Sequence, residues 1–130
     1  MCNDNNNKIY KLNGQNFDDF DGFIRECNHS FIHEFGGNWS GNLDAFNDFL
    51  AWSDVGIYTL RWLNSDKSRH NLGYSAMVDW LSGNLERCLP SNRKFVRKRL
   101  RAAQNSMGQT LFDLIVEIIK EHHPYVLLEV

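Results

Sequence analysis

Three short runs of residues that favour β-strands, widely separated along the chain, constrain its fold most strongly. Residues 8–12 alternate polar and apolar side chains before the turn signal Asn13-Gly14, and residues 57–63 are rich in β-branched and aromatic side chains. A last apolar run covers residues 125–128. Because the long stretches between these runs have helical periodicity, and helical crossovers favour parallel pairing, the pattern predicts an α/β fold. We expect a three-stranded, mostly parallel sheet packed with helices.

The stretches between the strands carry apolar side chains at helical spacing, and Pro90 and Pro124 are stop signals for the helices that precede them. The predicted helices cover residues 17–31, 43–52, 65–72, 74–89, 93–104 and 110–122. Residues 36–41 are rich in turn residues, so we expect a shaped loop there. Asn42 is the predicted N-cap of the helix that follows this loop.

The length of 130 residues suits one compact domain, and the hydrophobic fraction of 42% supplies enough apolar side chains for its core. We expect a flexible polar segment over residues 1–7 and a single domain over residues 8–130, with a helical insertion at about residues 65–109. The chain starts without the basic and apolar regions of a signal peptide, and no run of residues reaches membrane-spanning length. These features favour a cytoplasmic protein with no membrane contact.

The sequence shows no catalytic or metal-binding motif. Cys2, Cys27 and Cys88 are far apart and lack Cys-x-x-Cys spacing, so we expect reduced thiols rather than disulfides or zinc ligands. His122 and His123 are adjacent on a predicted helix and point in different directions, which favours a role at the helix end over metal binding. Without a Gly-rich phosphate loop or a nucleophile motif, we expect neither an enzyme nor a bound cofactor.

The net charge of −2 hides a strong asymmetry along the chain. Residues 1–54 contain nine acidic and three basic side chains, whereas residues 93–101 contain six basic side chains and no acidic one. An acidic surface favours a basic partner, while a basic helix binds nucleic acid or balances acids elsewhere in the molecule. For residues 93–101 we favour charge balance, and nucleic-acid binding by this helix stays as the alternative function.

The predicted helix over residues 43–52 separates an apolar face from an acidic one. Its interior positions are Leu43, Phe46, Phe49 and Leu50, and another face holds Asp44, Asn47, Asp48 and Ala51. Because Asp44 and Asp48 are four residues apart, their carboxylates project together from the helix. Taken alone, these acids are typical of a solvated helix face whose first turn complements the helix dipole.

A longer motif around these acids resembles a known family. Asn13-Gly14 after the first strand, followed by the run from Trp39 through Asn42-Leu43-Asp44-Ala45 to Asp48, resembles the signature region of barstar-like ribonuclease inhibitors. The chain end matches too, because a helix bearing Glu117 and Glu121 leads directly into the last strand. A longer barstar-related subgroup with a helical insertion is similar in its phrases Asn64-Ser65-Asp66-Lys67-Ser68, Leu72-Gly73-Tyr74 and Leu111-Phe112-Asp113.

The resemblance implies an immunity or antitoxin-type inhibitor that blocks the basic active site of a cytotoxic ribonuclease with an acidic helix and its adjoining loop. It places Asp48 where a carboxylate enters the phosphate-binding site of the nuclease, with Asp44 as a second acidic contact. Glu117 and Glu121 are then contacts from the neighbouring helix. Asn42 and Leu43 fall at helix-start contacts, and Asn47 and Ala51 lie on the same predicted partner surface.

Trp39 has two interpretations at this stage, as a partner contact in the loop before the helix or as an aromatic of the core. We include it in the predicted partner surface. The expected partner is a cognate basic ribonuclease or a ribonuclease toxin domain, which need not be barnase itself. On its own the protein is expected to be a monomer.

Overall fold

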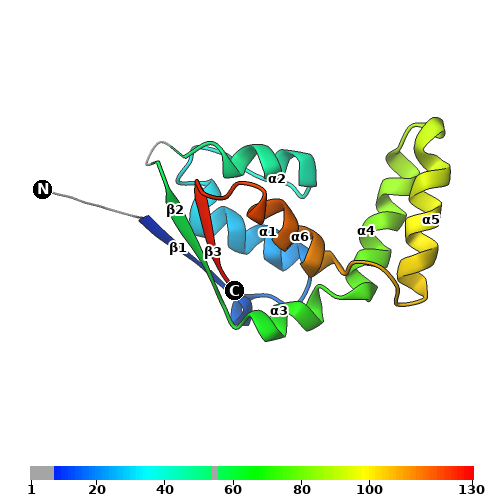
Figure 1. The fold of residues 1–130 in the computed structure, drawn as a ribbon, viewed down its shortest axis with the longest axis horizontal. Coiled ribbons are helices and arrows are strands. Elements are labelled where there is room, and N and C mark those ends of the chain that lie inside the picture. The colour runs from blue at the N-terminus through cyan, green and yellow to red at the C-terminus, as the bar shows by residue number, and fades with distance from the viewer. Residues whose placement is uncertain (1–7, 54–55) are drawn as a thin grey trace, which may run out of the picture.

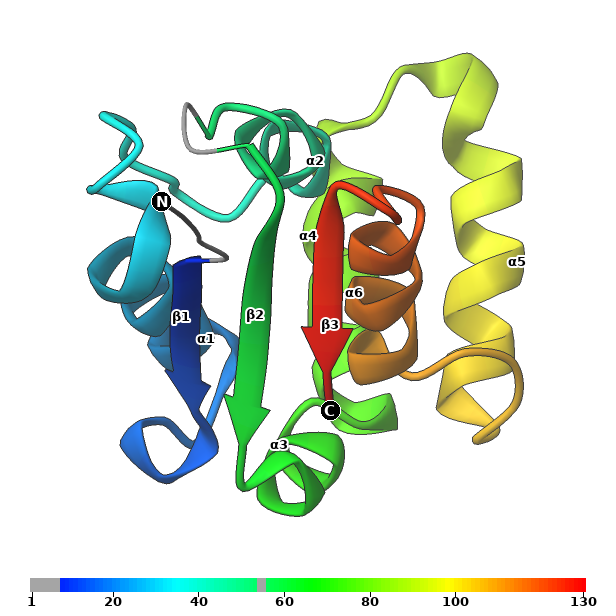
Figure 2. The ribbon, with the colours of Figure 1, turned by 60° about the vertical axis from the view of Figure 1, so that its left-hand side comes forward.

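The chain folds around a three-stranded parallel sheet (Figures 1 and 2). This computed structural model describes residues 8–53 and 56–130, so the predicted flexible segment over residues 1–7 lies outside the described residues. The strands are β1 (Lys8–Asn13), β2 (Tyr58–Leu63) and β3 (Val126–Glu129), and β2 lies between the other two. Both strand pairs are parallel. The predicted α/β class and the mostly parallel sheet are therefore confirmed.

Helices account for most of the remaining described chain. The α-helices are α1 (Phe20–Cys27), α2 (Leu43–Leu50), α3 (Ser65–Asn71), α4 (Tyr74–Arg87), α5 (Arg93–Gln104) and α6 (Leu111–Lys120). Shorter segments are the 3₁₀ turns η1 (Gly14–Asn16) and η3 (Pro90–Asn92) and the π-helical η2 (Asn28–Ile32). The predicted helix over residues 17–31 is thus α1 continued by η2. It begins later than predicted because Asp19 is its N-cap, whose side chain accepts the Gly22 N–H.

The elements form three tiers (Figure 1). The sheet is the first tier, α1, α2 and α6 cover one of its faces, and α4 and α5 stand on the far side of those helices. Alternate strand residues such as Leu12, Leu60 and Trp62 are buried against the covering helices. The ring centroid of Trp62 lies 5.2 Å from that of Phe23 on α1 and 4.9 Å from that of Phe112 on α6. Trp62 therefore joins the sheet to two of the helices above it.

The helices between β2 and α6, where the helical insertion is predicted, fall into two parts that are attached differently. In α3, Lys67 Nζ donates to the carbonyl oxygens of Gly14 and Phe17 at 3.0 and 2.6 Å, so this short helix is fixed to the end of the sheet. The hairpin of α4 and α5 stands away from the sheet. At its base the Phe112 N–H donates to the Leu72 carbonyl at 2.7 Å. The protruding part of the predicted insertion therefore begins at α4.

Candidate functional site

The helix α2 displays the two predicted acids and is fixed at both ends. At its start, the Asn42 side chain accepts the Ala45 N–H at 2.9 Å, which confirms the predicted N-cap. At its end, the Tyr58 hydroxyl donates to the Leu50 carbonyl at 2.6 Å. Burial, with a smaller contribution from Tyr10, raises the pKa of Tyr58, so this hydroxyl stays a donor at neutral pH.

Burial divides α2 into the two faces that its sequence predicts. Leu43, Phe46 and Leu50 are buried in the core, while Asp44 and Asp48 are exposed. Phe49, predicted to face the interior, is only partly buried, and Asn47 and the C-cap residue Ala51 are exposed. The two carboxylates stand one helical turn apart, about 6 Å, on a single rigid element.

Trp39 lies beneath this acidic face rather than on it. Its side chain is 2% exposed, and its ring centroid lies 4.7 Å from that of Phe46. The indole Nε1–H donates to the Asn42 carbonyl at 2.7 Å. The buried Asn28 side chain accepts the Trp39 N–H and donates to the Trp39 carbonyl, both at 2.8 Å. The prediction that Trp39 contacts a partner is therefore wrong, because the ring packs and positions α2; the core interpretation is correct.

The acids of α6 are exposed, and one side-chain contact ties the end of this helix to α2. Just after α6, the Nε2 atom of His122 lies 2.7 Å from Asn47 Oδ1, so Asn47 is partly engaged within the molecule. Glu117 accepts a short hydrogen bond from the Gln109 side chain. Glu121 is the C-cap of α6. Asn47, Glu117 and Glu121 thus surround the end of α6, while Asp44 lies at the other end of α2.

The cations of α5 form two groups with different surroundings. Lys94, Arg97, Lys98 and Arg101 are exposed and recur at the spacing of one outer helix face. Arg99 lies instead on the inner side, with its guanidinium 5.9 Å from the Trp80 ring and 6.0 Å from the Phe95 ring. No cation of α5 forms an ion pair with an acid in residues 8–53 or 56–130. The charge balance favoured from the sequence therefore involves no direct ion pair within these ranges.

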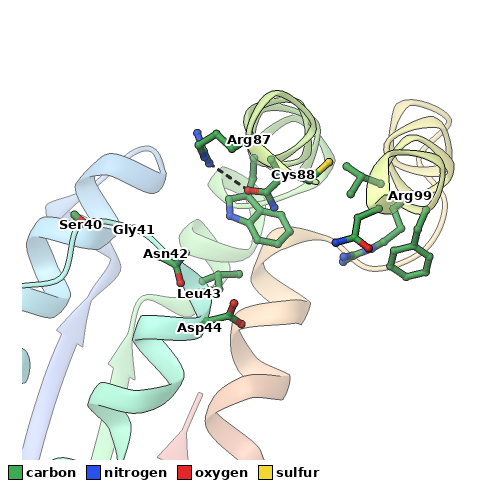
Figure 3. A pocket seen from close by; sticks show the side chains of 13 residues that line it. Ser40, Gly41, Asn42, Leu43, Asp44, Arg87, Cys88 and Arg99 are labelled. Carbon is green, nitrogen blue, oxygen red and sulfur yellow. Dashed lines mark hydrogen bonds between the residues drawn. The ribbon is translucent and has the colours of Figure 1, made fainter. Parts of the chain in front are cut away.

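A groove of about 830 Å³ separates the start of α2 from the α4–α5 hairpin (Figure 3). Asn42, Leu43 and Asp44 line its α2 wall. On the hairpin wall, Arg87 donates to the Asn84 side chain at 3.2 Å, and Arg99 follows on α5. The α2 wall carries one carboxylate, that of Asp44, and the hairpin wall carries the cations Arg87 and Arg99. Asp44 therefore belongs both to the groove and to the acidic face. No local sequence pattern predicts the groove, because its walls come from residues 40–44 and 80–99, which lie far apart in the sequence.

Within the described residues, no group of three or more His, Cys, Asp or Glu side chains could hold a metal ion. Nor does the described chain contain a helix that is long and apolar enough to cross a membrane. The site offers two exposed carboxylates on a fixed helix beside a groove of mixed charge. This arrangement suits the recognition of a cationic protein surface.

Comparison with protein-family models found no match, and searches of curated proteins and of solved structures found no similar protein.

Proposed function

We propose that the protein is a barstar-like inhibitor of a cytotoxic ribonuclease and acts in the cytoplasm of the cell that makes the nuclease. The observation that carries this proposal is the placement of Asp44 and Asp48. Both are exposed, one turn apart, on a helix that Asn42 caps and that Tyr58 holds at its other end. The sequence motif that contains these acids and the contacts that hold their helix in place therefore both support the proposal.

The mechanism follows from the charge that a ribonuclease must stabilise. Its active site presents Arg, Lys and His side chains to phosphate oxygens, and these cations repel one another when the site is empty. A carboxylate can take the place of a phosphate oxygen there. Because Asp44 and Asp48 are carried by a fixed helix, they meet such cations with little loss of conformational entropy on binding. In this proposal Asp48 enters the centre of the nuclease site and Asp44 lies at its rim.

Around the central acid, the proposed contact surface extends to Asn47, Ala51, Glu117 and Glu121. Asn47 already contacts His122, so its amide holds part of the surface in place as well as meeting the partner. Asn42 contributes at the start of α2, where it lines the groove. Leu43, also predicted as a contact, lines the same groove, but its side chain is buried and offers a partner little surface. The inhibitor itself performs no chemistry and needs no metal, so a chelator should leave inhibition unchanged.

The proposal is tested with purified basic ribonucleases of the barnase type and the variant Asp48→Ala. The variant is expected to keep the fold, because Asp48 is exposed and alanine favours helix. It is expected to weaken binding by about 2–5 kcal/mol, mostly through faster dissociation, because the cations of the nuclease are left desolvated and unpaired. Asp79→Ala is the matched control, since Asp79 is an exposed acid in the middle of α4.

Calorimetric titration and a thermal melt on each variant separate lost binding from lost folding. Asp79→Ala should inhibit as the wild type does. A folded Asp48→Ala protein with wild-type affinity would refute the proposed interface, and reproducible RNA cleavage by the purified protein would refute the inhibitor function.

A second candidate function, nucleic-acid binding by α5, has one observation in its favour. The helix carries an exposed stripe of four cations, and none of them forms an ion pair with an acid of the described residues. These cations are Lys94, Arg97, Lys98 and Arg101. Such a stripe can neutralise phosphates. An electrophoretic mobility shift with RNA in moderate salt tests it, and a shift that Arg97→Glu and Arg101→Glu together abolish would support it.

A further inference from the structure

The groove beside α2 has a wall that carries Arg87 and Arg99. A nuclease that contacted only the acidic face would leave this wall without a binding partner. We infer that this groove is the second half of the inhibitory surface and receives an acidic surface loop of the bound ribonuclease, whose carboxylate meets Arg99, with Arg87 beside it. The inference rests on the proposed function and narrows the class of ribonuclease that the protein would bind. The nuclease would carry an anionic loop next to its cationic cleft.

The guanidinium of Arg99 is positioned to bind a carboxylate. Its guanidinium lies near the rings of Trp80 and Phe95, and cation–π contacts of this kind hold the planar group while leaving N–H donors at its edge. Arg99 has no acidic partner among residues 8–53 and 56–130. Because a carboxylate accepts two parallel hydrogen bonds from such a group, it is the side chain that fits best.

The position of the groove makes it part of any contact with the acidic face. Asp44 lines the groove, so a protein that covers Asp44 also covers the groove entrance. A partner that is cationic throughout would then be repelled by Arg87 and Arg99, which line the same groove as Asp44. It would also leave Arg99 desolvated without a partner, which is costly. An acidic loop removes both penalties.

The volume of the groove agrees with a loop as its occupant. At about 830 Å³ it lies in the range of roughly 300–1,000 Å³ that is usual for binding pockets, and it is open to solvent. It therefore admits several side chains rather than a single ion.

Residues of the groove wall and of the outer face both lie on α5, so variants of the outer face can serve as controls for variants of the groove wall. Arg99 lines the groove, whereas Arg97 does not.

The first experiment measures inhibition constants against a basic ribonuclease that the wild-type protein inhibits. Arg99→Gln should weaken inhibition at least about thirtyfold, because the anionic loop loses its charged partner. Arg99→Glu should weaken it further by repulsion. Arg97→Gln and Arg97→Glu on the outer face should stay within about twofold. Thermal melts identify any variant that fails to fold, and Arg87→Gln tests the same wall without disturbing the contacts of Arg99 with the two rings.

The second experiment asks whether the bound nuclease covers the groove. Cys88 lines the groove and is partly exposed, whereas Cys27 is fully buried. Burial raises the pKa of the Cys27 thiol and keeps it unreactive, so Cys88 is the reporter among these two residues. Alkylation of Cys88 by iodoacetamide, followed by peptide mass analysis, should be slowed at least tenfold in the complex. An unchanged rate would overturn the inference.

The outcomes separate the inference from the function on which it rests. If Asp48→Ala abolishes inhibition while folded Arg99 and Arg87 variants inhibit normally, the inhibitor function stands and the acidic-loop inference falls. If the wild type inhibits none of the nucleases, the function fails, and the groove is tested alone by NMR titration of ¹⁵N-labelled protein. A glutamate-containing peptide should then shift the Arg99 Nε–H signal, and its glutamine counterpart should not. A shift produced by inorganic phosphate alone, or no shift at all, would overturn the inference.

Discussion

The acidic helix α2 and the basic helix α5 carry their charges on very different supports. Beneath α2 lie Phe46 and Trp39, both almost fully buried in the aromatic core that also includes Trp62. Beneath α5 the packing is sparse, since Ala103 is its one fully buried side chain and Val96 and Leu100 are partly exposed. The acids are therefore fixed to the core of the domain, whereas the cations lie on its outermost tier.

This difference indicates what each surface can do. An acid fixed to a rigid core meets a partner in one geometry, which favours affinity and specificity. A stripe of long cationic side chains on an outer helix interacts over distance and with little geometric demand. Arg99 is the exception on α5, because two aromatic rings hold it next to the acidic helix. In the proposed function, α2 and the groove recognise the partner, and the outer face of α5 has a lesser role.

The largest expected effect tests the support of α2. Phe46→Ala should lower the free energy of unfolding by about 3–5 kcal/mol, because it leaves a cavity among Phe23, Phe31 and Trp39. Phe95→Ala on α5 should change it by less than about 0.5 kcal/mol, since that side chain is 64% exposed. Urea denaturation measures both. Equal losses would show that the two helices are supported alike.

A smaller effect tests the loop that leads into α2. Asn28→Ala removes both hydrogen bonds to the Trp39 backbone and should lower the free energy of unfolding by about 1–3 kcal/mol. Asn92→Ala is the control, because Asn92 is exposed and makes no side-chain cap bond to α5. Denaturation curves on both variants, at matched slope, measure the difference. No loss in Asn28→Ala would show that the loop holds its shape without this contact.

The next effect concerns binding rather than folding. Asp44→Ala should weaken binding to an inhibited ribonuclease by about 1 kcal/mol, less than Asp48→Ala, because a rim charge acts mainly on association. Stopped-flow association rates at several salt concentrations measure this, and the salt dependence should become shallower. If Asp44→Ala instead speeds dissociation more than Asp48→Ala does, the assignment of centre and rim must be exchanged.

The smallest effect is expected on the outer face of α5. Arg97→Glu with Arg101→Glu should leave inhibition nearly intact, because neither side chain lines the groove; both line a separate hollow on α5. Stability should change by less than about 0.5 kcal/mol, with new attraction to neighbouring cations offsetting the lost charges. A severe loss of inhibition by a folded variant would move the interface to this face.

Local patterns predicted the secondary structure well because each element carries its own signal. Alternation marked β1, the β-branched and aromatic run marked β2, and Asn42 marked the start of α2, each close to the observed bounds. The division of α2 into buried and exposed faces followed from helical spacing alone. Element ends depended on caps, as Asp19 shows by starting α1 later than the apolar spacing suggested.

Such local patterns could not predict the tertiary contacts. Trp39 could be a contact or a core residue from its sequence, and only its packing on Phe46 decides between the two. The groove depends on how the α4–α5 hairpin stands relative to the start of α2, which no spacing within either element encodes. The bond between Asn47 and His122 joins residues 75 positions apart and likewise had no local signal.

The hydrogen bond between the Leu72 carbonyl and the Phe112 N–H gives the hairpin a modular character. The chain leaves the inner tiers at Leu72 and returns at Phe112, so the two points of attachment are direct neighbours in space. A short turn leading from Leu72 to Thr110, the N-cap of α6, could replace the hairpin while keeping every strand and the three helices that cover the sheet. The groove wall would be lost and the acidic helix retained. If the proposed function holds, grafting another segment at this point would change partner selectivity while the scaffold stays the same.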